Sequence, residues 1–188
     1  MNANRKRREE EWITGVQAGS ESAFDQMFEA FYDRLCAFAT GIVGSQTGAR
    51  QVVHDVFLKI WRRRQEWTVR RSLKAYLYQA TRNQALNYAD STDRRRAVEP
   101  TMDDSRKPVH KTEHTAEDEL HKTELAESIW AAIDQLPERR RTAFVLHRQH
   151  DMTYADVAEV MGISKKTVEH QMGHALKTLR EELPGDLI

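Results

Sequence analysis

The stretch TYADVAEVMGISKKTVEHQMGHALKTLR, residues 153–180, decides how the C-terminal end of this chain folds. Its spacing predicts two helices joined by a tight turn. Thr153 stands three residues before Asp156, so the two side chains can cap the first helix reciprocally. Gly162 can adopt the positive φ that ends this helix, and Ser164 is a favourable N-cap for the next. A helix-turn-helix of this kind places its second helix in the major groove of DNA.

The second of these helices has one apolar and one polar face. The apolar residues recur at helical spacing and are expected to face the core: Val168, Met172, Ala175 and Leu179. Lysines can reach guanine or phosphate, and a glutamate can accept a hydrogen bond from the amino group of cytosine. A helical hairpin that only packs, and never touches DNA, would show the same apolar pattern. The candidates for contacting DNA are Ser164, Lys165, Lys166, Thr167, Glu169, His170, Gln171, His174 and Lys177.

Composition limits the class of protein. A chain of 188 residues, 39% hydrophobic and 31% charged, fits one large or two small domains of a soluble helical protein. The single cysteine, Cys36, cannot form an internal disulfide. No apolar run approaches the roughly 20 residues of a membrane span. The basic start, MNANRKRREEEW, lacks the apolar core of a signal peptide, so a cytoplasmic protein is expected.

Charge is unevenly distributed along the chain, although the formal net charge is zero. Residues 59–96 contain 11 Lys or Arg residues against 3 Asp or Glu residues. Residues 97–125 contain 4 basic residues against 8 acidic residues. Such segregation indicates several partner surfaces, of which only some face phosphate.

The whole sequence favours helices, so an all-α fold is expected. Strand-length runs of β-branched residues are absent, and the chain has only 4 prolines and 8 glycines. Ser72 is a plausible N-cap for the fourth helix, and Pro137 suits the first turn of a later one. Apolar periodicity predicts helices over residues 10–18, 21–42, 48–64 and 73–89, resumes over 125–136, and continues after Pro137 into the helix-turn-helix.

A segment of different character separates the two helical parts. Residues 90–123 hold two prolines, many charges and almost no large apolar residues. Such a segment cannot bury enough surface to offset the entropy of ordering it. Two small helical domains joined by a flexible linker are therefore expected. The boundaries are a basic tail at 1–9, a helical domain at 10–93, an acidic linker at 94–122, a helix-turn-helix domain at 123–183 and a tail at 184–188.

Basic and aromatic residues crowd the junction between the third and fourth expected helices. Lys74, Tyr78 and Arg82 lie four residues apart and so share one helix face. Cations neutralise phosphates while rings stack on bases, so the junction is a candidate site for partly unstacked nucleic acid. An ordinary solvated face is the alternative. The candidate residues are Arg62, Arg63, Arg64, Trp67, Arg70, Arg71, Lys74, Tyr78, Arg82 and Asn83.

The two helical parts resemble a known family. The block FDQMFEAFYDRLCAFATGIVGSQTGARQVVHDVFLKIWRRRQEW, followed by LKAYLYQATRNQALNY, resembles sigma region 2. The block LAESIWAAIDQLPERRRTAFVLHRQHDMTYADVAEVMGISKKTVEHQMGHALKTLR resembles sigma region 4. The ordered pair, without a region 3 between them, is similar to group IV, extracytoplasmic-function sigma factors of bacterial RNA polymerase. The phrases FLKIW, LKAYLYQATRN and KTVEHQMGHALK are similar to the FecI-like branch common in Bacteroidetes.

The resemblance implies a protein that directs the polymerase to promoters and performs no chemistry itself. A surface of the third helix would dock on the β′ clamp helices of core polymerase: Val52, His54, Asp55, Phe57, Lys59 and Trp61. The junction at 62–72 would capture a flipped base of the −10 element, and the fourth helix would contact the flanking duplex and the opened strand. The last helix would read the −35 element. The acidic linker would thread toward the RNA path. The implied partners are core polymerase (β′ clamp helices and β flap), promoter DNA and an anti-sigma factor bound to the membrane.

The chain departs from the family pattern in three places. Gln51 and His54 stand where many members have an aspartate and a glutamine before the docking element. Residues 87–90, NYAD, replace an arginine-rich end of the fourth helix. Gln171 stands where the family often has a histidine, and His170 precedes it.

Other classes of function fit less well. Histidine pairs with i, i+4 spacing lack a cysteine or a matched carboxylate set, so no metal or cofactor is expected. No nucleophile motif or Gly-rich phosphate loop is present, so an enzyme is not expected and no catalytic residue is assigned. A stand-alone LuxR-like helix-turn-helix regulator remains the alternative, with a protein-binding adaptor as a second. A LuxR-like regulator should carry an α/β receiver or ligand-binding domain in its first half.

Overall fold

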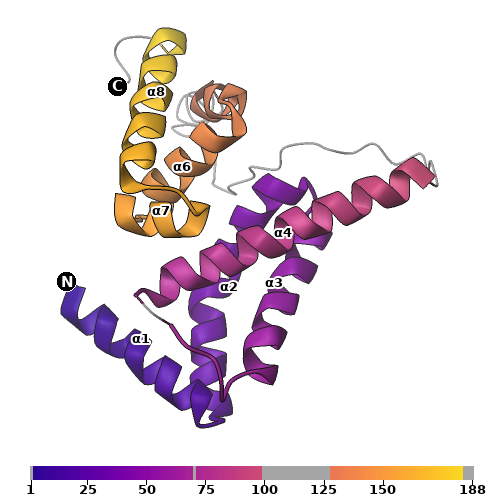
Figure 1. Ribbon diagram of the computed structural model, residues 1–188, viewed down its shortest axis with the longest axis vertical. Coiled ribbons are helices and arrows are strands. Elements are labelled where there is room, and N and C mark those ends of the chain that lie inside the picture. The colour runs from indigo at the N-terminus through magenta and orange to yellow at the C-terminus, as the bar shows by residue number, and fades with distance from the viewer. Residues whose placement is uncertain (1, 70, 99–127, 184–188) are drawn as a thin grey trace, which may run out of the picture. The chain divides into compact units, whose positions relative to one another are not determined.

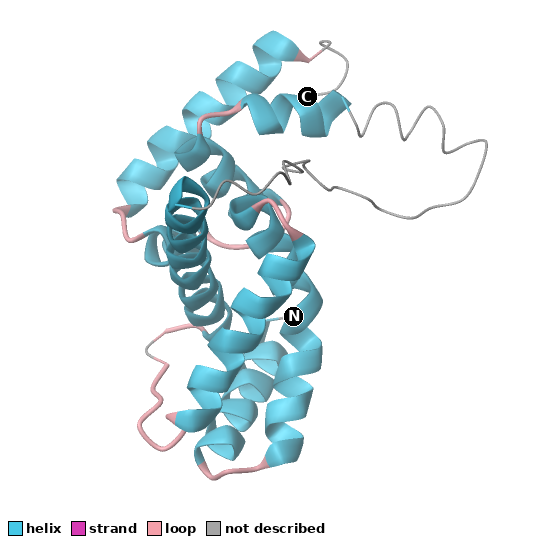
Figure 2. Cartoon of the chain, turned by 90° about the vertical axis from the view of Figure 1, so that its right-hand side faces the viewer, coloured by secondary structure: helices cyan, strands magenta, loops and turns pink. Residues whose placement is uncertain are grey.

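The computed structural model describes residues 2–69, 71–98 and 128–183, and within these ranges every regular element is a helix. The all-α prediction is confirmed. Backbone contacts divide the chain into two compact units, Met1–His110 and Lys111–Ile188. Among the described helices, none is both long and apolar enough to cross a membrane. The elements are labelled in Figure 1, and loops join the helices within each unit (Figure 2).

The first unit is built around α2. It contains α1 (Asn2–Gln17), α2 (Glu21–Val43), α3 (Gln46–Arg62) and α4 (Leu73–Val98). Helix α2 packs against the other three, and α4 runs across both α2 and α3 (Figure 1). The side chains between these helices are fully shielded from water or nearly so: Met27, Leu35, Phe38, Val52, Val53, Phe57, Leu77 and Tyr78. This apolar contact area stabilises the bundle.

Serine caps set the starts of three helices in this unit. The hydroxyls of Ser20, Ser45 and Ser72 each accept a hydrogen bond from a backbone N–H three residues later, at 3.3 Å. Each bond satisfies a donor that the first turn would otherwise leave unpaired. The predicted N-cap at Ser72 is therefore confirmed.

Two helices are longer than their apolar periodicity predicts. Helix α1 begins at Asn2 instead of residue 10, because exposed pairs such as Lys6–Glu10 at 3.9 Å and Arg7–Glu11 at 3.5 Å support a helix that has no apolar face there. Helix α4 continues to Val98 instead of ending near residue 89. Residues 94–98 of the expected linker lie in α4, and residues 99–122 lie outside the described part of the chain.

The second unit contains a helical segment at residues 128–135, then α6 (Glu138–Arg148), α7 (Tyr154–Met161) and α8 (Lys165–Glu182). Helix α8 packs against α6 and α7. One apolar cluster joins Ile133 and Leu136 to Ala175 and Leu179 of α8. The predicted inward face of α8 is confirmed, since Val168, Met172, Ala175 and Leu179 are all buried.

Candidate nucleic-acid interface

The turn before α8 is fixed by local hydrogen bonds. Thr153 and Asp156 form the predicted reciprocal cap, with the Thr153 N–H donating to Asp156 Oδ2 at 3.2 Å and the Asp156 N–H donating to Thr153 Oγ1 at 3.2 Å. Gly162 ends α7 with φ of 65°. Ser164 Oγ then accepts from the Thr167 N–H at 3.0 Å. These caps fix the end of α7 and the start of α8 through residues of the turn itself.

The polar face of α8 is open to solvent. All nine predicted DNA-contacting residues at 164–177 are exposed or half-buried. Two of the lysines pair with glutamates one turn later, Lys165 with Glu169 at 3.8 Å and Lys177 with Glu181 at 3.9 Å. Exposed pairs of this kind contribute only about 0.3–0.5 kcal/mol, so phosphate or a base edge can replace the glutamate at small cost. The predicted reading face is therefore sterically available.

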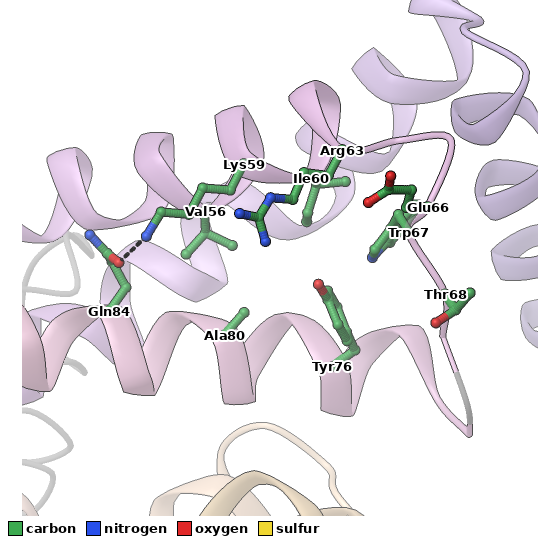
Figure 3. Close-up of a pocket in the computed structure, with 10 residues that line it drawn as sticks. All are labelled: Val56, Lys59, Ile60, Arg63, Glu66, Trp67, Thr68, Tyr76, Ala80 and Gln84. Atoms are coloured by element: carbon green, nitrogen blue, oxygen red, sulfur yellow. Dashed lines mark hydrogen bonds between the residues drawn. The ribbon is translucent and has the colours of Figure 1, made fainter.

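A pocket lies between α3, α4 and the loop that joins them (Figure 3). Its volume of ≈ 410 Å³ falls within the roughly 300–1,000 Å³ of small-molecule sites. Lys59 Nζ donates to Gln84 Oε1 at 2.6 Å, and Gln84 Nε2 donates to Asp55 Oδ2 at 3.3 Å, which joins the two helices at one end. The lining residues are Val56, Lys59, Ile60, Arg63, Glu66, Trp67, Thr68, Tyr76, Ala80 and Gln84.

Trp67 gives this pocket an unused hydrogen-bond donor. The side chain is 5% exposed, and its ring meets the Tyr76 ring edge-on at 5.9 Å between centroids. The buried indole Nε1 has no hydrogen-bond partner. In the close-up this nitrogen points into the space between α3 and α4 (Figure 3). An unsatisfied buried donor costs about 1–3 kcal/mol, which an acceptor on a bound group would offset.

Two of the residues predicted to contact the −10 element, Lys74 and Tyr78, are buried in the helical bundle. Tyr78 is fully buried and its ring lies 5.2 Å from that of Phe38, so it is a core residue and cannot stack on a base. Lys74 is only 8% exposed. The expected shared face of Lys74, Tyr78 and Arg82 is thus not an exposed surface. Arg82 is half-buried, Asn83 is exposed, and Arg70 lies outside the described residues.

The arginines at the end of α3 and in the loop that follows differ in their partners. Arg64 Nη1 donates to the Trp61 carbonyl at 2.9 Å, and its guanidinium lies 4.7 Å from the centre of the Trp61 ring. These contacts hold Arg64 at the end of its own helix. Arg62, Arg63 and Arg71 are exposed. The guanidinium groups of these three arginines are therefore open to solvent, whereas that of Arg64 is held against Trp61.

The expected docking surface on α3 is also divided. Val52 and Phe57 are buried and support the helix from inside, whereas His54 and Lys59 are exposed and Asp55 and Trp61 are half-buried. Leu58 was not predicted to belong to this surface. Its side chain is 44% exposed, and it is the one large hydrophobic side chain found exposed among the described residues. Its place four residues after His54 was the available signal.

No described part of the chain brings three or more His, Cys, Asp or Glu side chains together as metal ligands.

Two family models match the chain in order. The model for Sigma-70 region 2 matches residues 27–95, and that for Sigma-70, region 4 matches residues 126–179. The ECF RNA polymerase sigma-E factor of Haemophilus influenzae is 24% identical over 176 residues, covering 91% of this chain and 93% of that protein. The chain belongs to the extracytoplasmic-function sigma-70 family.

Further comparisons agree with this assignment. The RNA polymerase sigma-H factor of Pseudomonas aeruginosa is 23% identical to this sigma factor and covers 93% of both chains. The structure of CnrH in complex with the cytosolic domain of CnrY has a TM-score of 0.66 at 20% identity and covers 93% of this chain and 96% of that one. The sigma factor RpoE of Bartonella quintana, in complex with the anti-sigma factor NepR, also gives 0.66 at 21% identity, covering 84% of this chain and 94% of that one. At these identities the structures show the shared fold.

The family assignment settles the general function. Sigma factors are transcription initiation factors and not catalytic enzymes, and this protein has the function of an RNA polymerase sigma factor. The LuxR-like alternative is not favoured, because the first half of the chain matches sigma region 2 and its described residues form helices only.

Proposed function

We propose that this sigma factor docks on core polymerase through the outer face of α3, and reads the −10 element with the α3–α4 loop and the −35 element with α8. The observation that carries the proposal is the pairing of two open sites in one chain. One is the exposed polar face of the capped helix α8, and the other is the basic pocket beside α3. A stand-alone regulator would need only the first.

The docking surface consists of the exposed or half-buried residues on the outer face of α3, with Leu58 at its centre: His54, Asp55, Leu58, Lys59 and Trp61. The ring of His54 stacks on that of Tyr32 at 5.4 Å, with 26° between the planes, and so extends the surface onto α2. An apolar side chain surrounded by polar groups is typical of a protein-binding site.

Replacing Leu58 by Glu tests this surface. We expect L58E to weaken binding to core polymerase at least tenfold while leaving the folded bundle intact, because the side chain is already 44% exposed. The matched control is Ala37→Glu, the same type of change at an exposed position of α2. Equal core affinities for the two variants, measured by fluorescence anisotropy, would refute docking through Leu58.

The −35 assignment rests on α8. Lys165 and Lys166 are exposed in its first turn, where the recognition helix of such a motif meets the bases. We expect the double reversal Lys165→Glu and Lys166→Glu to abolish transcription from promoters that depend on a −35 element, with core affinity unchanged. Retained promoter recognition would instead favour the protein-binding adaptor.

Three narrower assignments are part of the same proposal. The phrases FLKIW and LKAYLYQATRN support the FecI-like branch common in Bacteroidetes. A cytoplasmic location fits the work of a polymerase subunit. The similarity to sigma factors whose structures contain CnrY or NepR supports an anti-sigma partner, for which we propose a membrane-bound protein. Purification from a native host should recover such a partner from the membrane fraction, and its loss should raise transcription from the target promoters.

A further inference from the structure

Helix α1 reaches the α3–α4 loop through one side chain. Gln17, the last residue of α1, donates from Nε2 to the backbone carbonyl of Trp67 at 2.7 Å. The two residues are 50 positions apart in the chain. This bond joins an element outside the pocket to the residue whose indole N–H faces into it.

The donor stands on a rigid corner. The turn between α1 and α2 is closed by backbone hydrogen bonds, from the Gly19 N–H to Val16 at 3.0 Å and from the Ser20 N–H to Gly15 at 2.9 Å. Val16 is fully buried. A Cβ at Gly15 would lie 2.5 Å from the Cβ of Ala23, so α1 and α2 are in close contact at this corner. Gln17 therefore presents its amide from a fixed position.

Trp67 is held at two places. Its backbone carbonyl accepts from Gln17, and its ring packs edge-on against Tyr76 of α4. Within the loop, the Glu66 N–H donates to the Arg63 carbonyl at 2.9 Å, which closes a local turn just before Trp67. Removing the Gln17 amide takes away the donor that holds the Trp67 carbonyl, so the backbone at Trp67 loses its bond to the α1–α2 corner.

We propose that Gln17 is a positioning residue for −10 recognition. It holds Trp67 so that the indole N–H is offered to an unstacked base of the −10 element in the α3–α4 pocket. Arg63 on the pocket wall supplies positive charge for the adjoining phosphate. The inference rests on the proposed function of this loop. It makes α1, which lines no part of the pocket, a determinant of promoter opening.

The test compares four variants of the full chain in complex with core polymerase. Gln17→Glu keeps the shape of the side chain but replaces the donor with an oxygen, which repels the Trp67 carbonyl. Gln17→Lys keeps a donor. Trp67→Phe keeps a ring against Tyr76 and removes the indole N–H. Gln26→Glu is the matched control, because Gln26 is exposed on α2 and contacts Trp12 instead of the loop.

Three quantities are measured: the melting temperature, the affinity for core polymerase, and opening of the −10 element, followed by fluorescence of 2-aminopurine in the promoter. We expect Q17E to reduce the opening equilibrium about tenfold, the equivalent of roughly 1.4 kcal/mol, with core affinity unchanged. We expect Q17K and Q26E to match the unmodified protein. Because Gln17 acts through Trp67, Q17E combined with W67F should open the promoter no worse than W67F alone.

Three results would overturn the proposal. These are normal opening by Q17E, equal losses for Q17E and Q17K, or multiplicative losses for Q17E and W67F. If Gln17 only stabilised the fold, Q17E would lower the melting temperature and the core affinity together with promoter opening. That result would also contradict the proposal. Failure of the unmodified protein to open any promoter with core polymerase would count against the proposed function itself.

Discussion

At the scale of single residues, Tyr78 and Trp67 are both buried but differ in their surroundings. Tyr78 has no exposed surface and packs on Phe38, while Trp67 keeps an unpartnered donor beside a pocket. Replacing Tyr78 by Ala should therefore cost about 3–5 kcal/mol of folding stability, as for other large aromatic deletions. Asn83→Ala, on the exposed side of α4, should leave stability unchanged and weaken −10 binding. Urea denaturation and promoter binding measure the two effects; a Y78A variant of normal stability would contradict the core role.

The half-buried thiol of Cys36 should react more slowly in the folded protein than in the unfolded chain. Burial raises the pKa of this thiol above its ordinary value, and the thiolate is the reactive form. Iodoacetamide at pH 8 should modify Cys36 much more slowly in native protein than in urea. The folded state holds this proton more tightly, so the contribution of Cys36 to stability falls as pH rises above the ordinary thiol pKa. Equal alkylation rates in the two states would contradict the assigned burial.

At the scale of elements, local caps predicted the helix-turn-helix well. Thr153, Gly162 and Ser164 act on their own turns, so their roles can be read from the sequence without knowledge of the rest of the fold. The start of α1 and the end of α4 were not predicted from apolar periodicity. Charged pairs and the absence of helix breakers extend a helix beyond its apolar stripe. The burial of Tyr78 and the bond from Gln17 to Trp67 depend on how α1, α2 and α4 pack, which spacing along one helix does not contain.

Loss of the α8 cap should weaken both folding and DNA reading in the second unit. Ser164→Ala removes the acceptor for the Thr167 N–H and should cost about 1 kcal/mol of stability. Because the first turn of α8 carries Lys165 and Lys166, binding to the −35 element should fall as well. Ser45→Ala at the start of α3 is the control, with a similar loss of stability and no effect on −35 binding. Unchanged −35 binding by S164A would show that recognition of the −35 element does not depend on this cap.

At the scale of the whole molecule, the zero net charge conceals a division between basic and acidic segments. The region from 59 to 96 carries the excess of cations, and the acidic residues of 97–122 belong to the proposed linker. We propose that these acids occupy a basic channel of the polymerase until the transcript displaces them. Replacing them by amides should change the ratio of abortive to full-length transcripts. An unchanged ratio in a single-round transcription assay would refute this role.

The central claim is that the two units act together, and only on core polymerase. The most direct test is in vitro transcription with purified core, with and without this protein, on a pool of genomic fragments from a candidate host. We predict new transcripts that depend on the protein and start downstream of shared −35 and −10 elements. Tight promoter binding without core, together with no new transcripts in its presence, would contradict the account and indicate a stand-alone regulator.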